Sequence, residues 1–318
     1  MAQLPGWSFA DSPFHAGEQQ VQQRLGIREQ METAGRRVLR NFMPDQHRDF
    51  FAGLPFLVIG TVDAAGQPTL SVVAGAPGFL STPDAATLHV AAPPPGADLR
   101  EGGDIGILGI DFATRRRNRA NGLVARVGAE SFDIAVKQSF GNCPRYIQAR
   151  EWLAVPAAPD PLRRAATLGP FEQALVAGAD TFFIASALGS VRDKPSQGVD
   201  ASHRGGPPGF VRVDDERTLT VPDFNGNSYY NTLGNLALNP RCALLFLDFA
   251  EGTTLQVAAA AETVWEGPEV QRFAGAERVL RFHVRECVTL PHALPLRWRF
   301  REYSPFLGAL GSWDAAKK

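Results

Sequence analysis

A repeated pattern of strands is the feature that most constrains how this chain can fold. The apolar runs at 55–62, 87–90 and 106–112 recur in the same order at 181–188, 218–221 and 243–249. Gly209 follows Gly78 by 131 residues, and Leu219 follows Leu88 by the same distance. Asp248 follows Asp111 by 137 residues, so the second copy carries a short insertion before its last matched strand. We therefore predict a duplicated β-rich unit, and such a fusion reproduces the two-fold contact of a homodimer.

The remaining segments suggest how the two copies are arranged. Residues 1–15 are predicted to form an arm over the body, and helical spacing at 18–51 predicts two or three helices. The proline-rich stretch 155–164 is the best linker, which gives domains at 1–158 (helices and first copy) and 159–318 (second copy). The basic string 114–122 is interpreted as a turn, with Asn121-Gly122 as a hairpin turn. Residues 143–151 are expected to form a short helix.

Composition excludes several classes of function. The 32 basic and 33 acidic residues nearly balance, which argues against a general nucleic-acid or anionic-membrane surface. Three scattered cysteines show no CxxC spacing, and six histidines show no HxxxH spacing, so a metal site has no support. The N-terminus lacks a secretory pattern, and no apolar run reaches the ~18 residues that span a bilayer. We expect a cytoplasmic protein.

Residues 200–249 concentrate the polar side chains. A short helix is predicted at 231–239, with Asn231 or Thr232 as its cap, and hydrogen-bonding residues crowd its start. Because the first N–H groups of a helix lack partners, such a start favours an anion. The plainer interpretation is a tight turn at 225–227, a solvated Arg204 and a packed His203. The candidate residues here are Ser202, His203, Arg204, Asn225, Asn227, Asn231, Thr232 and Asn235.

Several strings together make the chain resemble a known family. They are PFHAGE (13–18), GIDFATRRRNRANG (109–122), FGNCPRYIQ (140–148), SHRGGPPGFV (202–211), PDFNGNSYYNTLGNL (222–236) and NPRCALLFLDF (239–249). They resemble the pyridoxamine 5′-phosphate oxidase-like, FMN-binding split-barrel proteins, in particular the tandem flavin-nucleotide-binding members. The resemblance implies an α+β, mainly β fold: two tandem antiparallel split β-barrels with flanking short helices. It also implies FMN, held without a covalent bond at the junction of the barrels.

The resemblance departs from the parent oxidase at the phosphate grip. Aligned on Asn239-Pro240, the oxidase's Ser-Arg-Lys falls on Tyr230, Asn231 and Thr232, so the basic pair is missing. We expect Arg204, His203 and Thr232 to contact the phosphate instead, and we do not transfer the oxidase's reaction. The four arginines of the basic string, Arg115, Arg116, Arg117 and Arg119, supply a second source of cations for a phosphate or carboxylate, and the first three are taken as candidate site residues. The alternative for this string is a solvated turn that pairs with acidic residues of the other copy.

The function expected from these residues is that of an FMN-dependent oxidoreductase. Electrons would come from NAD(P)H or a partner reductase and pass to a small-molecule redox substrate, and the chain would act as an intrachain pseudo-dimer, with a homodimer left open. The rival interpretations are a split barrel that binds F420 or haem, and a non-enzymatic flavin-binding module. Cys143 is expected to be buried and structural, although a reactive thiol at a helix start remains the alternative. Asp111 and Asp248, which match across the repeat, are expected to stabilise strand ends.

Overall fold

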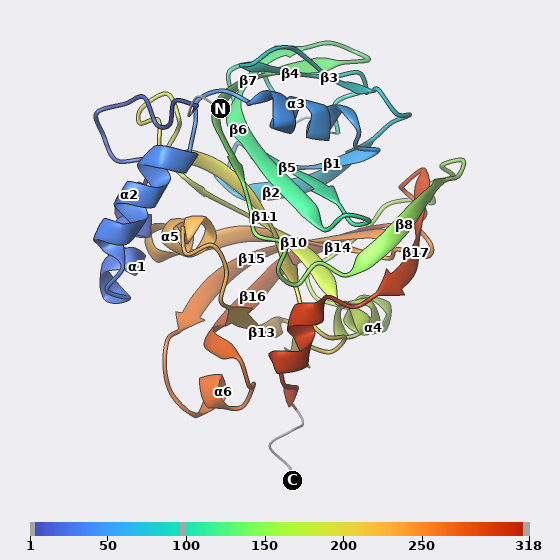
Figure 1. Cartoon of the computed structure of the whole chain (residues 1–318). Helices are drawn as coiled ribbons and strands as arrows, with labels where there is room; N and C mark the ends of the chain where they lie inside the picture. The colour runs from blue at the N-terminus through green and yellow to red at the C-terminus, as the bar shows by residue number, and fades with distance from the viewer. Residues whose placement is uncertain (1–3, 96–98, 314–318) are drawn as a thin grey trace.

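The chain begins with three helices, as the helical spacing at 18–51 predicts. The computed structural model describes residues 4–95 and 99–313, and the part of the predicted arm before residue 4 lies outside them. The helices are α1 (Ala16–Arg24), α2 (Arg28–Val38) and α3 (Asp45–Ala52). α1 begins with a capping box: the His15 side chain accepts from a backbone N–H, and Glu18 accepts from the His15 N–H. Figure 1 shows α1 and α2 lying together beside the second half of the chain.

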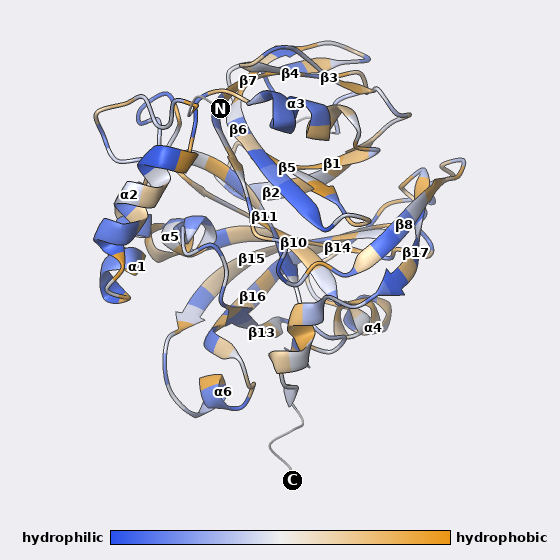
Figure 2. Ribbon diagram, in the orientation of Figure 1, coloured by the Kyte–Doolittle hydropathy of each residue, from blue (hydrophilic) through white to orange (hydrophobic). Residues whose placement is uncertain are grey.

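The first copy forms a seven-stranded antiparallel sheet in the order β2-β1-β5-β6-β7-β4-β3. Its interior is a continuous cluster that includes Leu57, Ile107 and Phe132. Figure 2 shows β1 and β5 as mainly hydrophobic ribbons, whereas β6 begins with a hydrophilic stretch. The strands are β1 (Phe56–Val62), β2 (Pro68–Ala74), β3 (Leu80–Asp84), β4 (Thr87–Val90), β5 (Asp104–Asp111), β6 (Arg116–Val127) and β7 (Phe132–Gly141).

The second copy repeats this sheet strand for strand, in the order β11-β10-β14-β15-β16-β13-β12. The same succession of antiparallel strands confirms the predicted duplication and the mainly β fold class. A short additional strand, β9 (Arg163–Ala165), pairs with β16. The strands are β10 (Thr181–Leu188), β11 (Gly198–Gly205), β12 (Arg212–Asp215), β13 (Thr218–Phe224), β14 (Arg241–Leu247), β15 (Thr254–Val264) and β16 (Ala276–Leu290). The helices of this half are α4 (Pro170–Gly178), α5 (Asn231–Leu238), α6 (Pro268–Gln271) and the terminal 3₁₀ helix η1 (Pro305–Ala309).

The strand that follows each sheet joins the two halves. β8 (Ala149–Ala154) follows β7, β17 (Leu296–Glu302) follows β16, and the two pair antiparallel with Trp152 opposite Trp298. One buried cluster also contains side chains from both halves, among them Phe56 and Phe183. The halves therefore share a hydrophobic core, as the two subunits of an obligate dimer do. The predicted linker at 155–164 is mostly exposed and has no regular structure before β9.

Three local predictions were wrong. Residues 116–122 belong to strand β6, and Asn121-Gly122 lies at a bulge within it, because polar partners on the other half satisfy its side chains. Residues 143–148 form turns that lead into β8 instead of a helix. α5 is capped by Tyr230 in a left-handed conformation (φ 63°) and has no side-chain cap, because Asn231 and Thr232 bond to Glu18 and Ser202.

Candidate functional site

Two adjoining cavities lie where the first half meets the start of α5. We call the first, of about 70 Å³, the helix-end cavity. The second, of about 40 Å³, is lined by Cys143 and is called the thiol cavity. They share the side chains of Arg117, His203, Arg204 and Phe224. The helix-end cavity is lined by Arg117, Arg119, Asn142, Ser202, His203, Arg204, Asp223, Phe224, Gly226, Asn227, Ser228, Tyr230, Asn231, Thr232 and Leu233.

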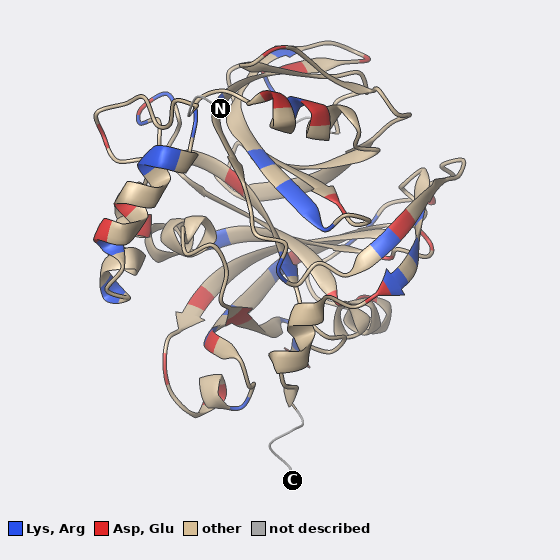
Figure 3. Cartoon of the chain, viewed as in Figure 1, with Lys and Arg blue, Asp and Glu red and all other residues tan. Residues whose placement is uncertain are grey.

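Both halves of the duplicated chain contribute to these cavities. Side chains two residues apart on a strand face the same way, so Arg117 and Arg119 of β6 both reach the second half. Figure 3 shows the basic residues along the start of β6 and, below it, the strands of the second sheet. β11 supplies residues 202–204, Asn142 comes from the segment after β7, and the segment from β13 to α5 supplies the rest.

The start of α5 presents backbone donors to the helix-end cavity. Ser228 and Tyr230 both have positive φ (62° and 63°), which turns the chain sharply from β13 into the helix. Since no side chain caps α5, its first N–H groups are not satisfied within the helix. These groups and the helix dipole together favour an anion at this end.

Arg119 is neutralised by a buried polar network. It donates to Asp200 Oδ1 at 2.9 Å, to Asn231 Oδ1 at 3.3 Å and to the Ser202 hydroxyl. Asp200 also accepts from the side chains of Asn121 and Asn235, at 2.8 and 3.0 Å. A buried ion pair with these additional hydrogen bonds holds the two halves in register. Arg119 therefore has little charge left for a ligand.

Arg117 lacks a partner of this kind. It donates to the Cys143 carbonyl at 3.0 Å, to the His203 carbonyl at 3.2 Å and to His203 Nδ1 at 3.1 Å. Within residues 4–95 and 99–313, no carboxylate lies within ion-pair distance of it. Burial, with Arg119 and Arg204 nearby, lowers the pKa of Arg117 to about 10, so it is still a cation at neutral pH. A partly buried cation whose contacts are all neutral favours an anionic ligand.

His203 adds a donor that has no acceptor. A guanidinium can only donate, so Nδ1, which faces Arg117, is the accepting nitrogen and the proton is on Nε2. Burial and the nearby cations of Arg117, Arg150 and Arg204 lower the pKa of His203 well below its ordinary value, so the ring is neutral. Its side chain is 4% exposed, and Nε2 has no partner in the described part of the chain. Nε of Arg204 and Nδ2 of Asn142 are likewise buried without partners there.

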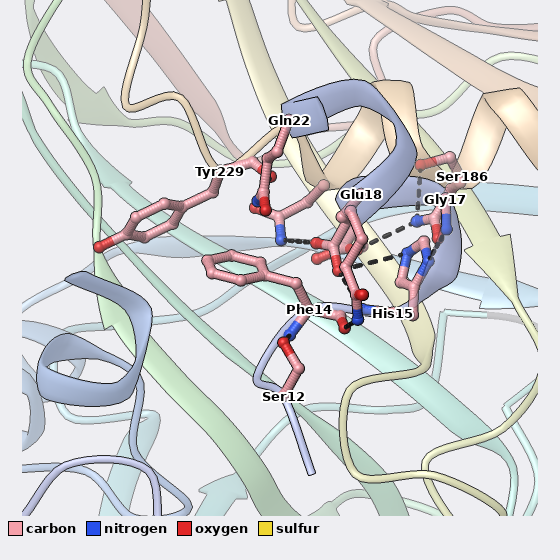
Figure 4. Close-up of polar contacts among 12 residues, drawn as sticks. Ser12, Phe14, His15, Gly17, Glu18, Gln22, Ser186 and Tyr229 are labelled. Atoms are coloured by element: carbon pink, nitrogen blue, oxygen red, sulfur yellow. Dashed lines mark hydrogen bonds and ion pairs between the residues drawn. The ribbon is translucent and has the colours of Figure 1, made fainter. Parts of the chain in front are cut away.

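The N-terminal arm runs directly into α1, and the two together (residues 4–24), called the arm from here on, fix α5 from the other side. Asn231 donates to Glu18 Oε1, and Asn235 donates to Ser186 at 3.1 Å; Figure 4 shows His15 and Glu18 within this group of contacts. The two helices approach closely, because a Cβ built on Gly17 would lie 2.0 Å from the Gly234 carbonyl oxygen. Burial and the charge of Asp200 raise the pKa of Glu18 well above its usual range. The arm therefore anchors α5 through the side chain of Glu18, whose raised pKa favours the neutral carboxylic acid.

The structure separates the predicted site residues into three groups. Ser202, His203, Arg204, Asn227, Asn231, Thr232 and Arg117 line the helix-end cavity, and Asn225 lines the thiol cavity. Asn235 lies behind this wall, on Ser186 and Asp200. Arg115 pairs with Glu302, and Arg116 is exposed over the Phe50 ring, so both lie outside the two cavities.

Sequence reasoning did not select several lining residues, among them Asn142, Cys143 and Asp223. Arg119 was one of the four arginines considered as ligands, but the prediction of a turn concealed its strand alternation with residues 117 and 121. Cys143 was expected to be buried and is instead partly exposed. The reason is that residues 143–148 form an open turn at the cavity rim rather than a helix packed on the body.

Comparison with known proteins agrees with this architecture. Residues 172–292 match the model of the family described as pyridoxamine 5′-phosphate oxidase. No curated protein sequence matches the chain. No helix among the described residues is long and apolar enough to cross a membrane.

Two of the similar solved structures each cover less than half of the chain. HupZ of Group A Streptococcus is 13% identical over 37% of this chain and 90% of its own, with a TM-score of 0.29. The FAD binding protein of Mycobacterium smegmatis is 14% identical over 40% and 99%, with a TM-score of 0.28. We infer nothing about ligands from matches at this level. Residues 172–292 therefore belong to the pyridoxamine 5′-phosphate oxidase family, and the first half repeats the sheet of that region strand for strand.

Proposed function

We propose that the chain is a flavoprotein that holds the phosphate of FMN in the helix-end cavity. The observation that carries the proposal is Arg117, a cation without a carboxylate partner among the described residues, beside the uncapped start of α5. His203 Nε2 and Arg204 Nε are buried donors without acceptors on the same wall. A phosphate has several acceptor oxygens and up to two negative charges, so it matches this set of donors.

The cavities in their present shape accommodate the phosphate rather than the whole cofactor. Sites for cofactors and drug-sized ligands usually measure about 300–1,000 Å³, whereas these measure about 70 and 40 Å³. Binding of a whole FMN therefore requires the lining side chains to move apart. Arg145 and Tyr146 of the thiol cavity are the candidates, since both are only half-buried on the turn before β8.

The chemistry divides between cofactor and protein. When bound, FMN would supply electron transfer, with electrons from a reduced nicotinamide or a partner reductase and a small organic molecule or oxygen as acceptor. This chain would orient the cofactor, neutralise its phosphate and exclude water. The cation that the parent oxidase carries beside its helix comes here from β6 of the other half. That change in the site is the reason not to assign oxidation of pyridoxamine phosphate.

A comparison of FMN with riboflavin tests the role of Arg117. The Arg117→Gln variant should bind FMN about 10- to 100-fold more weakly, since a hydrogen bond to a charged group contributes about 1.5–3 kcal/mol, and riboflavin should be unaffected. Arg116→Gln is the matched control, because Arg116 is adjacent on β6 but lies on Phe50. Affinity is measured by quenching of flavin fluorescence. Equal losses for FMN and riboflavin would contradict a phosphate contact.

The absorption spectrum of the purified protein distinguishes the cofactor classes. Flavin bands, with free FMN released on heating, support the proposal. A Soret band, or the spectrum of a deazaflavin, would assign the same donors to haem propionates or to the phosphate of F420. A colourless protein that leaves the fluorescence of added FMN unchanged would contradict flavin binding.

A further inference from the structure

Cys143 differs from the other two cysteines of the chain. Cys242 and Cys287 are buried (0% and 2% exposed), and their thiols point at the carbonyls of Ala259 and Thr167. Burial raises the pKa of both thiols. Cys143 is partly exposed and lines the thiol cavity. A reagent in solution can therefore reach Cys143 without unfolding the protein.

The guanidinium of Arg117 lies beside the sulfur of Cys143. Arg117 reaches the Cys143 sulfur at 3.7 Å and also donates to its carbonyl. Because no carboxylate among the described residues competes for Arg117, its charge is available to a thiolate, the nucleophilic form of cysteine. His203, 4% exposed, contributes an unpartnered Nε2 to the wall of the same cavity. This second donor indicates that the cavity takes a ligand with acceptor atoms.

The rim of the thiol cavity selects for negative charge. Arg145, on the turn that carries Cys143, donates to the side chain of Asn225 and stacks on Phe306. No carboxylate in the described part of the chain pairs with it. Arg117 and Arg145 therefore place two cations without acidic partners around one accessible sulfur. Tyr146 and Phe224 supply an aromatic wall, their ring centroids 5.1 Å apart.

We propose that Cys143 is a thiol positioned for exchange with small anionic disulfides. The Cys143 thiolate attacks one sulfur of the disulfide, a new S–S bond forms to the protein, the original S–S bond breaks, and its electron pair leaves on the second sulfur as a thiolate. The exchange needs no other oxidant, because the disulfide is itself reduced. Arg117 holds the attacking sulfur by a hydrogen bond, and Arg145 attracts the anionic reagent.

The two cavities share Arg117, so the thiol and the phosphate compete for one guanidinium. A phosphate in the helix-end cavity would draw the Arg117 charge away from the Cys143 sulfur and slow the exchange. This coupling rests on the proposed function. The reactivity of Cys143 itself does not, because it depends on residues that are present whether or not a flavin binds.

The rates of two reagents test the proposal on the native full-length chain. One is 5,5′-dithiobis(2-nitrobenzoate), which is anionic, and the other is 4,4′-dithiodipyridine, which is neutral. Wild type should react at one thiol per chain, and Cys143→Ser should abolish that phase. Arg145→Gln should slow the anionic reagent about threefold or more and leave the neutral one unchanged, since it removes only a partly screened charge. Arg117→Gln should slow both reagents about tenfold, because it removes a hydrogen bond from a charged donor to the attacking sulfur.

A control variant and a test of folding show whether a change in rate comes from the substituted side chain. Arg116→Gln should match wild type with both reagents, and far-ultraviolet circular dichroism establishes that each variant is folded. Equal rates for wild type, Arg117→Gln and Arg145→Gln would overturn the proposal, as would a native protein with no reactive thiol. FMN added at saturation should slow the anionic reagent in wild type. Fast exchange at a rate that FMN does not change would support the reactive thiol and contradict its coupling to the phosphate site. A lack of FMN binding in the fluorescence assay would contradict only the proposed function.

Discussion

The two halves of the chain have the same sheet but different sites. By strand register, Ser186, Asp200 and Ser202 of the second half correspond to Thr61, Thr69 and Ser71 of the first. Arg119 on β6 corresponds in the same way to Gln256 on β15. The buried ion pair between Arg119 of the first half and Asp200 of the second is thus replaced, at the equivalent position, by the neutral side chains of Gln256 and Thr69. Duplication has kept the residues that pair strands, while the residues between the sheets have diverged.

The segments that cover these equivalent positions also differ between the two halves. In the second half, α5 and the N-terminal arm fill the space beside Asp200. In the first half, residues 91–95 and 99–103, which take the place of α5, have no regular structure. A cavity of about 490 Å³ lies there, lined by Thr61, Thr69, Ser71 and Gln256 among others. The sheet can therefore form without a buried ion pair at this position. The charges of Arg119 and Asp200 occur where α5 and the arm cover them.

Removal of the buried cation should give the largest difference in stability between equivalent substitutions in the two halves. Arg119→Met leaves Asp200 buried without its ion-pair partner, which should cost about 3–5 kcal/mol. Gln256→Met at the corresponding position should cost less than about 1 kcal/mol, because Gln256 is half-exposed and its amide can be solvated. The free energy of unfolding in urea measures both. Equal losses would mean that the Arg119–Asp200 pair contributes nothing beyond side-chain packing.

The contact between the arm and α5 should have the next largest effect. A Cβ on Gly234 would lie 2.5 Å from the backbone nitrogen of Glu18, so Gly234→Ala should cost about 1–3 kcal/mol. It should also speed trypsin cleavage at Arg24 and Arg28, since the arm must move away. Gly178→Ala is the control, because no atom lies within 4 Å of its added Cβ. Unchanged proteolysis in Gly234→Ala would contradict the docked arm.

The carboxyl group of Glu18 should make the stability of the docked arm depend on pH. Its pKa is raised in the folded state by burial and by Asp200, so above its unfolded pKa the native state binds more protons than the unfolded state. Stability from this group is therefore complete at low pH and is lost as the pH rises through the raised pKa. Glu18→Gln cannot ionise, so its stability relative to wild type should increase with pH over that range. Urea unfolding at a series of pH values checks this, and parallel curves would mean that Glu18 is not the titrating group.

Sequence patterns identified the local elements of structure and missed the contacts that form between the two halves. The repeat, α5 and the polar stretch from Ser202 to Thr232 could all be read from periodicity and residue type. β6 could not, because RRRNRANG has the composition of a turn and its partners Asp200 and Ser202 are about eighty residues away in sequence. Cys143 was missed for a different reason: its contact with Arg117, 26 residues away, depends on where a turn lies in the folded chain.

The smallest expected effect tests what the halves still share. Asp111 accepts from the backbone N–H of Ala113 at 3.0 Å, and Asp248 accepts from that of Ala250 at 2.9 Å, so each closes the turn after β5 or β14. Asp111→Ala and Asp248→Ala should each cost about 0.5–1.5 kcal/mol, the contribution of a typical hydrogen bond. The double variant should lose the sum, because distant sites are additive. A much larger loss of stability in Asp248→Ala than in Asp111→Ala, together with weaker FMN binding, would place Asp248 in the site. Similar losses with FMN binding intact would mean that the two copies have kept the same turns and have diverged only on the surfaces between the sheets.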